Sequence, residues 1–202
     1  MNRLLVFSLL LASLFFQLSL PADVHSQERN YVDLFIGASY GKMALGSETA
    51  LFAPRSRNFY GLEFNAKLNL HKNVGIILLD AGILYGRTKI PSPLGSQFDA
   101  NTSLQSYQFL FGPEVACRNR KVQIFGHGLL GTNHTAVVWN FGNNSPTLIG
   151  RTHFALGAGG ALDVNFKKHL AYRVFQADLI PTLVNGRWEK NYRFSIGIVA
   201  HF

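Results

Sequence analysis

Residues 58–69 read NFYGLEFNAKLN, and this stretch decides the fold because apolar and polar side chains alternate along it. Successive side chains of a β-strand point to opposite faces, so a period of two predicts a strand with one apolar and one polar face. One face carries Tyr60, Leu62, Phe64, Ala66 and Leu68, and the other carries Glu63, Asn65, Lys67 and Asn69. A slip of one residue would exchange the two faces, so the register of this strand is strongly specified.

Seven further segments show the same alternation, although residues 121–131 show it weakly because Gly126, Gly128 and Gly131 interrupt the pattern. We expect strands at residues 31–40, 58–69, 74–86, 104–117, 121–131, 152–166, 170–180 and 191–202. The sequence therefore predicts an all-β fold of eight antiparallel strands.

The predicted connections alternate in length. Those at residues 71–73, 118–120 and 167–169 are short, whereas those near 41–57, 87–103, 132–151 and 181–190 are mostly long and polar. Short turns at one end and long loops at the other are typical of an up-and-down transmembrane β-barrel whose long loops lie outside the cell. An even number of strands then places both ends of the barrel on the periplasmic side.

The predicted polar faces carry charged side chains of both signs in the middle of strands. These residues are Glu63, Lys67, Asp80, Asp163, Arg173 and Asp178. The interior of an eight-stranded barrel is narrow and filled by side chains, so acids and bases can pair there and no wide pore is expected. We expect the six residues to form a structural polar network in the lumen, with a proton or ion path as the less favoured interpretation.

The apolar faces carry aromatic side chains near the strand ends, including Tyr40, Tyr60, Tyr85, Tyr107 and Tyr192. Amphipathic rings of this kind form girdles at the two interfaces of a membrane barrel. A closed barrel also pairs every backbone group that hydrocarbon could not hydrate. We therefore expect the apolar faces to meet lipid.

One of the predicted strands raises a question of register. In residues 170–180, Arg173 has odd parity whereas Gln176 and Asp178 have even parity, so a regular strand cannot turn all three inward. A β-bulge near Val174 and Phe175 would restore the parity by adding one residue. Residues 74–86 read as a regular strand, with Ile77, Leu79, Ala81, Ile83 and Tyr85 on the face opposite Asp80.

The first 26 residues show the three parts of a secretory signal peptide. Asn2-Arg3 is positively charged, residues 4–20 are almost wholly apolar, and Pro21 ends the run. Cleavage after Ser26 leaves residues 27–202 as the barrel domain; cleavage after Ala22 is a second option, and an uncleaved anchor helix is less favoured because the run is short for a membrane span.

The net charge of +8 at pH 7 comes from Lys and Arg residues that are scattered and form no basic run, so nucleic acid is not an expected partner. Outer-membrane lipids and the phosphates of lipopolysaccharide suit scattered cations at a membrane surface better. The single cysteine, Cys117, excludes an intrachain disulfide.

Four stretches resemble the small outer-membrane β-barrel family, often described as OmpA-like or opacity-protein-like barrels. They are VDLFIGASY at 32–40, FLFGP at 109–113, FALGAGGALDV at 154–164 and YRFSIGIVAHF at 192–202. The terminal Phe202 is similar to the signal that the barrel-assembly machinery reads, which implies an assembly role for it. The resemblance covers essentially all of residues 27–202 and implies no periplasmic domain after the barrel.

Some eight-stranded outer-membrane barrels modify lipid A, so an acyl hydrolase or transferase is the main alternative. Such an enzyme needs a Ser nucleophile, a His base and an acid near the outer rim, and nothing local in the sequence pairs any of its histidines with a serine. A lipocalin-like soluble carrier is a further alternative. We assign no catalytic, metal or cofactor residue, and expect a structural or surface-interaction barrel whose function lies in its outer loops.

Overall fold

The computed structural model describes residues 31–44, 56–90, 100–119, 121–140 and 147–202. These residues form β1 (Val32–Ala44), β2 (Ser56–His71), β3 (Val74–Ile90), β4 (Ala100–Arg118), β5 (Val122–Asn140), β6 (Thr147–Lys167), β7 (Leu170–Leu179), β8 (Thr182–Val184), β9 (Arg187–Glu189) and β10 (Tyr192–His201). The residues 1–26 predicted as a signal peptide lie outside the described part. Within that part, no helix is long and apolar enough to cross a membrane.

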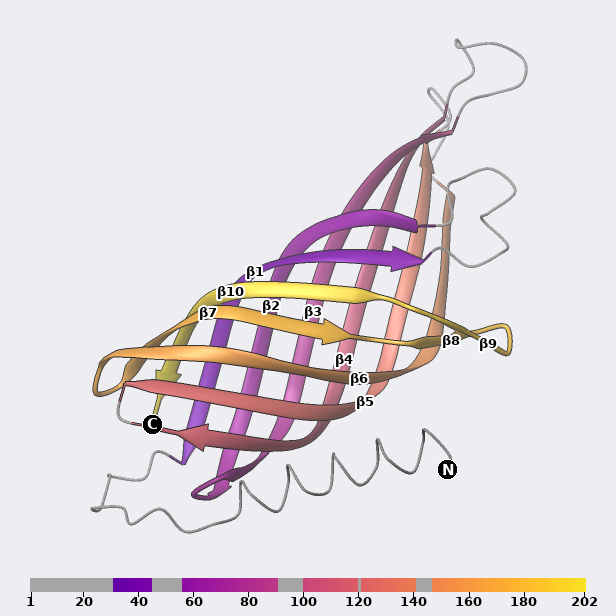
Figure 1. The fold of residues 1–202 in the computed structure, drawn as a ribbon. Helices are drawn as coiled ribbons and strands as arrows, with labels where there is room; N and C mark the ends of the chain where they lie inside the picture. Colours follow the sequence, from indigo (N-terminus) through magenta and orange to yellow (C-terminus); the bar gives the residue numbers. More distant parts are fainter. Residues whose placement is uncertain (1–30, 45–55, 91–99, 120, 141–146) are drawn as a thin grey trace, which may run out of the picture.

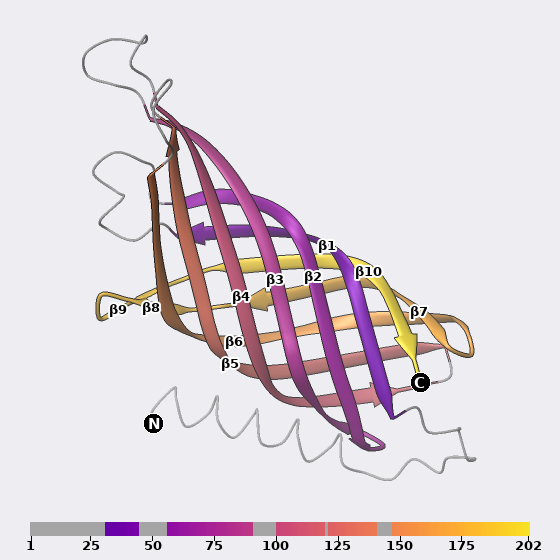
Figure 2. The ribbon, with the colours of Figure 1, turned by 180° about the vertical axis from the view of Figure 1, so that it is seen from behind.

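Eight of these strands close into a ring, in the order β5-β4-β3-β2-β1-β10-β7-β6, with β6 paired back to β5. Every pairing is antiparallel, which confirms the predicted fold class. Figures 1 and 2 show from opposite sides how the tilted strands wrap around one closed barrel.

The first and last strands of the ring meet where Gly37 pairs with Gly197. A Cβ atom at Gly37 would collide with the carbonyl oxygen of Ile196 and with the ring of Phe35. Glycine is therefore required at this point, because it leaves room for the Phe35 ring inside the seam that closes the barrel.

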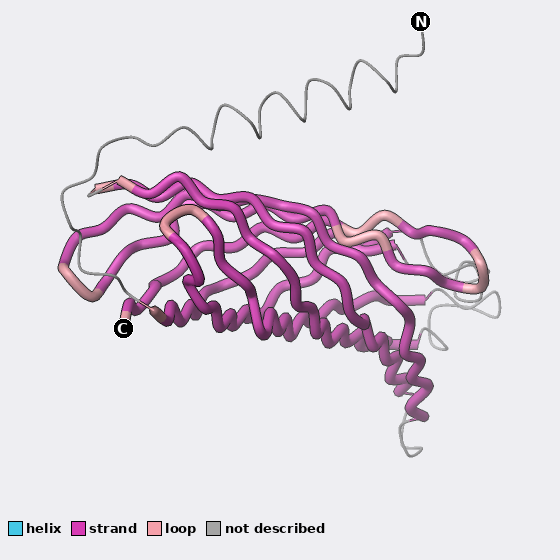
Figure 3. Tube along the Cα trace, turned by 90° about the horizontal axis from the view of Figure 1, so that it is seen from below, coloured by secondary structure: helices cyan, strands magenta, loops and turns pink. Residues whose placement is uncertain are grey.

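The two ends of the barrel differ as expected. Short turns join β2 to β3 and β6 to β7, and the C-terminus lies at the same end, where Phe202 accepts backbone hydrogen bonds from Tyr31 and Val32 at 2.6 and 3.1 Å. Figure 3 shows these turns and the C-terminus at one end, with the β8–β9 turn at the other.

The strands extend farther toward the other end than the sequence predicts. Much of the predicted loops 41–57, 87–103 and 132–151 is strand, since β1 continues to Ala44 and β5 to Asn140. The predicted bounds of these loops were wrong because outward side chains at this end are polar, which removes the contrast of period two while the backbone ladder continues. The remaining parts of these loops lie outside the described residues.

The predicted loop 181–190 is instead an ordered hairpin that adds β8 and β9 to the edge of β6. Its turn places Asn185 at φ 49° and Gly186 at φ 76°. Two adjacent residues with positive φ are typical of the type I′ turn, which Asn-Gly favours.

β7 contains the predicted bulge. On β10, Ser195 pairs with Gln176 and Gly197 pairs with Arg173, so one residue of β10 opposes both Val174 and Phe175. Val174 and Phe175 both point outward, and the flanking Arg173 and Gln176 both point inward. The prediction from charge parity is confirmed.

A second bulge, in β3, overturns one prediction. On β2, Ala66 pairs with Leu79 and Lys67 pairs with Ile77, which leaves Leu78 as an extra residue. Leu78 and Leu79 are both exposed, and Ile77 is buried inside the barrel rather than on its outer face. The assignment of Ile77 to the apolar outer face was therefore wrong.

Candidate functional site

The six charged residues predicted for the lumen are all inside the barrel. Glu63, Lys67, Asp80, Asp163, Arg173 and Asp178 are between 0 and 3% exposed. They fall into three groups at different places along the interior, and Gln176 joins the first two, since it accepts a hydrogen bond from Arg173 Nη1 at 2.7 Å and donates one to Glu63 at 2.7 Å. Their structural role stays a prediction.

The first group surrounds Arg193, a residue that is not among the six predicted for the lumen. Its guanidinium lies 2.7 Å from Asp80 Oδ1 and 2.7 Å from Asp178 Oδ2. The third carboxylate, that of Glu63, lies 3.3 Å from Arg193 Nε and accepts a hydrogen bond from Gln176 at 2.7 Å. One cation is thus the main partner of three buried carboxylates.

Two more side chains complete this group. His127 Nε2 lies 2.9 Å from Asp178 Oδ1, and Ser195 donates a hydrogen bond to Glu63. Ser195 also contacts the Ser39 hydroxyl at 3.0 Å. Each carboxylate therefore has a polar partner besides Arg193, which buried charges require.

The second group centres on Arg173. Its Nε and Nη2 atoms donate to the two carboxylate oxygens of Asp163 at 2.8 and 3.1 Å, the bidentate geometry that a guanidinium favours. The guanidinium also lies 4.2 Å from the centre of the Phe35 ring and 4.7 Å from that of Phe125. Two aromatic rings thus supply a cation–π environment in place of water.

The third group lies nearer the short-turn end. Lys67 Nζ lies 3.1 Å from Asp33 and 3.0 Å from Glu114. His201 Nδ1 lies 2.7 Å from Asp33, and Arg118 lies 3.3 Å from Glu114. Charges alternate in sign from Asp33 through Lys67 and Glu114 to Arg118.

The interior closes with apolar side chains toward the long-loop end. Inward-facing residues of β1 to β5 form one cluster there, made of Met43, Phe59, Leu84, Leu104 and Val137. A second cluster comprises Ile77, Leu110, Leu129, Ala155 and Ile180. At these levels the lumen is filled by side chains, as expected for eight strands.

The outward face of the barrel is apolar over most of its height. Ile36 and Leu62 are each 59% exposed, and Phe109 is 50% exposed. Toward the long-loop end, paired strands bring Tyr40, Tyr60 and Tyr85 into one row, and the rings of Tyr40 and Tyr60 lie 5.3 Å apart. We call these three residues the tyrosine row.

Cations follow immediately beyond the tyrosine row. Two residues farther out, Lys42 on β1 pairs with Asn58 on β2, and Arg87 on β3 pairs with Ser103 on β4. Together with Arg57, these residues line a pocket of about 940 Å³ over β1 to β4, which we call the rim pocket. Gln105 also lines it, and the tyrosine row contributes Tyr60 and Tyr85.

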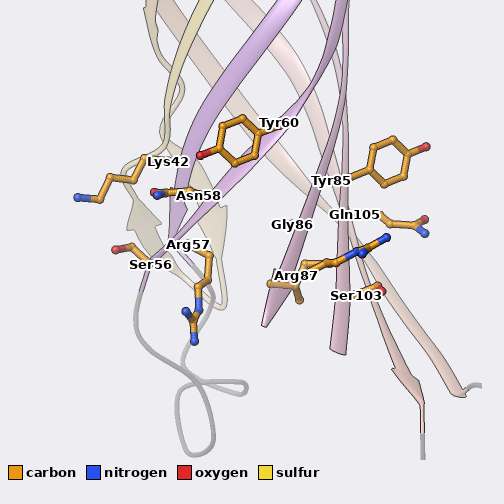
Figure 4. Close-up of a pocket in the computed structure, with 11 residues that line it drawn as sticks. Lys42, Ser56, Arg57, Asn58, Tyr60, Tyr85, Gly86, Arg87, Ser103 and Gln105 are labelled. Atoms are coloured by element: carbon orange, nitrogen blue, oxygen red, sulfur yellow. The ribbon is translucent and has the colours of Figure 1, made fainter. Parts of the chain in front are cut away.

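The rim pocket has a marked charge asymmetry. Among the described residues that line it, three are cations and none is acidic. Figure 4 shows the end groups of Lys42, Arg57 and Arg87 spread around the pocket rather than meeting at one point. Arg57 Nε is buried and has no hydrogen-bond partner in the part of the chain that the structure describes.

No protein-family model and no curated protein matches this sequence. Ail of Yersinia pestis, solved in complex with the heparin analogue sucrose octasulfate, matches with a TM-score of 0.58 and 16% identity, covering 86% of this chain and 99% of that one. Neisserial surface protein A matches with a TM-score of 0.57 and 9% identity, covering 85% and 97%.

The fold is that of the small outer-membrane β-barrels. A third match, the outer membrane protein OprG of Pseudomonas aeruginosa, has a TM-score of 0.50 and 14% identity, covering 88% of this chain and 99% of that one. At these identities the likeness is one of fold, so the function of this barrel has to be argued from its own residues.

Sequence reasoning identified the interior of the barrel better than its rim. Parity along each strand separates inward charges from outward apolar residues, and Arg193 and Glu114 satisfy the same criterion as the six residues that were chosen. The rim pocket was missed because Lys42, Arg57 and Arg87 fall in segments expected to be loops. The signal that could have revealed it is a cation two or three residues from each of Tyr40, Tyr60 and Tyr85.

Proposed function

We propose that this chain is an outer-membrane β-barrel protein with a structural or surface-interaction role and no wide pore. The observation that carries the proposal is the inverted distribution of polarity, with charges buried inside and large apolar side chains exposed outside. Water would penalise such an outer face, whereas hydrocarbon matches it. The closed ring also leaves no strand edge for hydrocarbon to meet.

The height of the apolar face agrees with this location. On the outward face of β2, Tyr60 and Leu70 are separated by ten residues, or about 33 Å along the strand. For a strand tilted by about 40°, this is about 25 Å along the barrel axis, which is the height of the apolar band of an outer-membrane barrel. The tyrosine row then lies at the outer interface, where outer-leaflet lipids, including lipopolysaccharide, are the proposed partners.

We infer how the chain is exported and assembled from residues 1–26 and from Phe202. We infer that residues 1–26 are a signal peptide removed after Ser26, and that residues 27–202 form the barrel. Phe202 is proposed as the signal for the barrel-assembly machinery; its side chain is 64% exposed, and its backbone is paired with the start of β1. Deletion of Phe202 should lower the amount of inserted barrel and leave signal cleavage unchanged.

The location is tested by expressing the full chain in a Gram-negative host and separating the membranes. The barrel should fractionate with outer membranes, require detergent after extraction, and give a far-UV spectrum dominated by β-structure. Unheated protein should also migrate differently from heated protein on electrophoresis. A folded monomer that stays soluble in buffer without detergent would overturn the proposal.

The geometry favours neither of the other two functions. A lipocalin-like carrier needs an apolar binding cavity inside, and the described interior is instead occupied by paired charges and packed apolar clusters. A lipid A-modifying enzyme needs a histidine beside a serine at the outer rim. His134 lies near that rim but hydrogen-bonds Thr152 at 2.8 Å, and His127 pairs with Asp178 inside the barrel. An assay for acyl release from lipid A by the folded protein would detect such an activity directly.

A further inference from the structure

The rim pocket has features of an anion-binding site that the structural role of the barrel does not require. Lys42 and Arg87 are exposed, and within the described residues neither of them, nor Arg57, forms an ion pair with a carboxylate. Three cations without a described acidic neighbour repel one another. Their positive potential is therefore available to an external anion.

The position of the pocket restricts the source of that anion. All of its long polar side chains except Arg57 occupy outward-facing positions, and the tyrosine row forms its membrane-side border. If the tyrosine row marks the outer interface, Lys42 and Arg87 lie at the level of lipid headgroups. Each is two residues beyond a tyrosine on its strand, and each residue advances about 3 Å along the strand. A lipid headgroup reaches this place by lateral diffusion, without entering the barrel.

The spread of the cations restricts the ligand further. Lys42 is carried by β1 and Arg87 by β3, and two strand spacings separate their backbones by roughly 10 Å. Their end groups point apart in Figure 4, toward two separate places on the rim. A ligand with two or more separated anionic groups fits this arrangement better.

The uncharged part of the pocket indicates what joins those groups. Asn58 offers a donor and an acceptor between Lys42 and Arg87, and Ser103 and Gln105 offer more on β4, beyond Arg87. Tyr60 and Tyr85 offer aromatic rings on the membrane side of the pocket. Amide and hydroxyl groups suit the hydroxyls of a sugar, and aromatic rings suit its apolar face. A phosphorylated saccharide combines all of these features.

We propose that the rim pocket binds the phosphorylated saccharide headgroup of an outer-leaflet glycolipid, with Lys42 and Arg87 each contacting a separate phosphate. Arg57 contributes positive potential from its half-buried position, where its Nε has no described partner. This inference rests on the proposed outer-membrane location and names the lipid that the barrel holds there.

The test compares two double variants that remove the same charges. K42Q/R87Q removes one lysine and one arginine from the pocket, and R187Q/K190Q removes one of each from exposed positions on and beside the β8–β9 hairpin. The full chain and both variants are folded in phosphatidylcholine nanodiscs and titrated with diphosphoryl lipid A, monophosphoryl lipid A or phosphatidylglycerol. Bound lipid is counted by native mass spectrometry.

The unaltered chain should prefer diphosphoryl over monophosphoryl lipid A by about tenfold, because one charge-assisted contact is lost. K42Q/R87Q should bind diphosphoryl lipid A about 30-fold more weakly and lose the preference, whereas R187Q/K190Q should change affinity by less than about twofold. If both double variants weakened lipid A binding equally, the attraction would be nonspecific, and that result would overturn the proposed binding at the rim pocket. So would phosphatidylglycerol binding as tightly as diphosphoryl lipid A.

Two further outcomes separate the source of the anion and the underlying proposal. If soluble sucrose octasulfate bound as tightly as diphosphoryl lipid A, the ligand would be a free anionic saccharide and the glycolipid assignment would be wrong. If every variant inserted into the nanodisc and K42Q/R87Q bound lipid A normally, the proposal that the rim pocket binds lipid A would be refuted. The proposed membrane location would be unaffected. Failure of the unaltered chain to insert at all would instead refute the membrane location itself.

Discussion

The two faces of β2 obey opposite rules. Glu63, Asn65 and Lys67 are between 1 and 4% exposed, whereas Leu62 and Phe64 on the other face are 59 and 38% exposed. In a water-soluble protein burial follows hydrophobicity, and here it follows polarity. The difference teaches that the strand satisfies two environments at once, a lumen that supplies charge partners and an exterior that must be apolar.

The two faces also differ in how their residues are stabilised. Inward side chains depend on particular partners, as Glu63 does on Arg193, Gln176 and Ser195. Outward side chains need only an apolar surrounding, which many residue types accept. Substitutions inside the barrel should therefore depend on which contact is lost, and substitutions outside should depend on polarity and depth.

The largest effect is expected from a deletion that exchanges the inward and outward faces of part of β2. Deleting Phe64 from β2 moves either Glu63 or the residues after it to the outward face, because alternation has a period of two. We expect no inserted barrel from this deletion. Deleting Phe175 from β7 should be tolerated, since Val174 would then pair regularly between Arg173 and Gln176.

The cost of the Phe175 deletion should be about 1 kcal/mol, mainly the loss of its ring contact with Phe194, whose centroid lies 6.2 Å away. Heat-modifiable migration reports insertion of both deletions, and reversible urea unfolding in vesicles gives the stability of the second. Equal tolerance of the two deletions would show that strand parity does not govern the placement of these side chains.

These bulges also show what the sequence can and cannot reveal. The bulge in β7 is predictable because Arg173, Gln176 and Asp178 mark the inward face with polar groups of conflicting parity. The bulge in β3 is hidden because Ile76, Ile77, Leu78 and Leu79 are all apolar, and such a run reads the same whichever residues turn inward. Fold and strand order are therefore predictable from periodicity, and register is predictable only where polarity changes.

The candidate sites follow the same division. Six lumen charges could be chosen from parity alone, but pairing could not, because Arg193 meets Asp80 and Asp178 through a closed ring that joins distant strands. The rim pocket was not predicted, because Lys42 and Asn58 are outward-facing and polar like the residues of a loop. Only the strand pairing shows that they belong to the barrel wall.

The second-largest effect is expected from removing the cation at the centre of the lumen. Arg193→Gln leaves Glu63, Asp80 and Asp178 without their shared guanidinium, and breaking a buried pair in this way costs about 3–5 kcal/mol. Urea unfolding of the variant in vesicles measures the loss. Arg187→Gln removes an equal charge from the exposed β8–β9 hairpin and should change stability by less than about 0.5 kcal/mol.

A loss below about 1 kcal/mol for Arg193→Gln would mean that the three carboxylates find other partners. The interior would then resemble the tolerant outer face, and the contrast between the two faces of β2 would concern polarity alone.

The third prediction places a charge on the outer face. Phe64 lies four residues inward from Tyr60, or about 10 Å below the tyrosine row, which is close to the middle of a 25-Å apolar band. Phe64→Arg should destabilise the barrel by about 2–4 kcal/mol in reversible unfolding experiments in vesicles. Phe64→Leu is the matched control and should be nearly neutral. If the arginine were tolerated, the outer face of β2 would not meet hydrocarbon.

The smallest effect is expected from Glu63→Gln, which keeps shape and polarity on the inner face and removes one charge. The amide oxygen can still accept a hydrogen bond from Gln176 or Ser195, and Arg193 keeps both Asp80 and Asp178 as partners. Removing one of three neighbouring carboxylates also relieves repulsion between like charges, which offsets the weakened contact with Arg193. The free energy of unfolding in vesicles should therefore change by less than about 1 kcal/mol.

Glu63→Leu provides the matched contrast, because the Gln176 amide and the Ser195 hydroxyl each lose an acceptor and keep only Asp178 and Ser39, so it should cost about 1–3 kcal/mol. If Glu63→Gln were as damaging as Phe64→Arg, the negative charge itself would be essential inside the barrel. The polar face of β2 would then hold a charge for a purpose other than packing, and a proton or ion path through Glu63 would become the better interpretation.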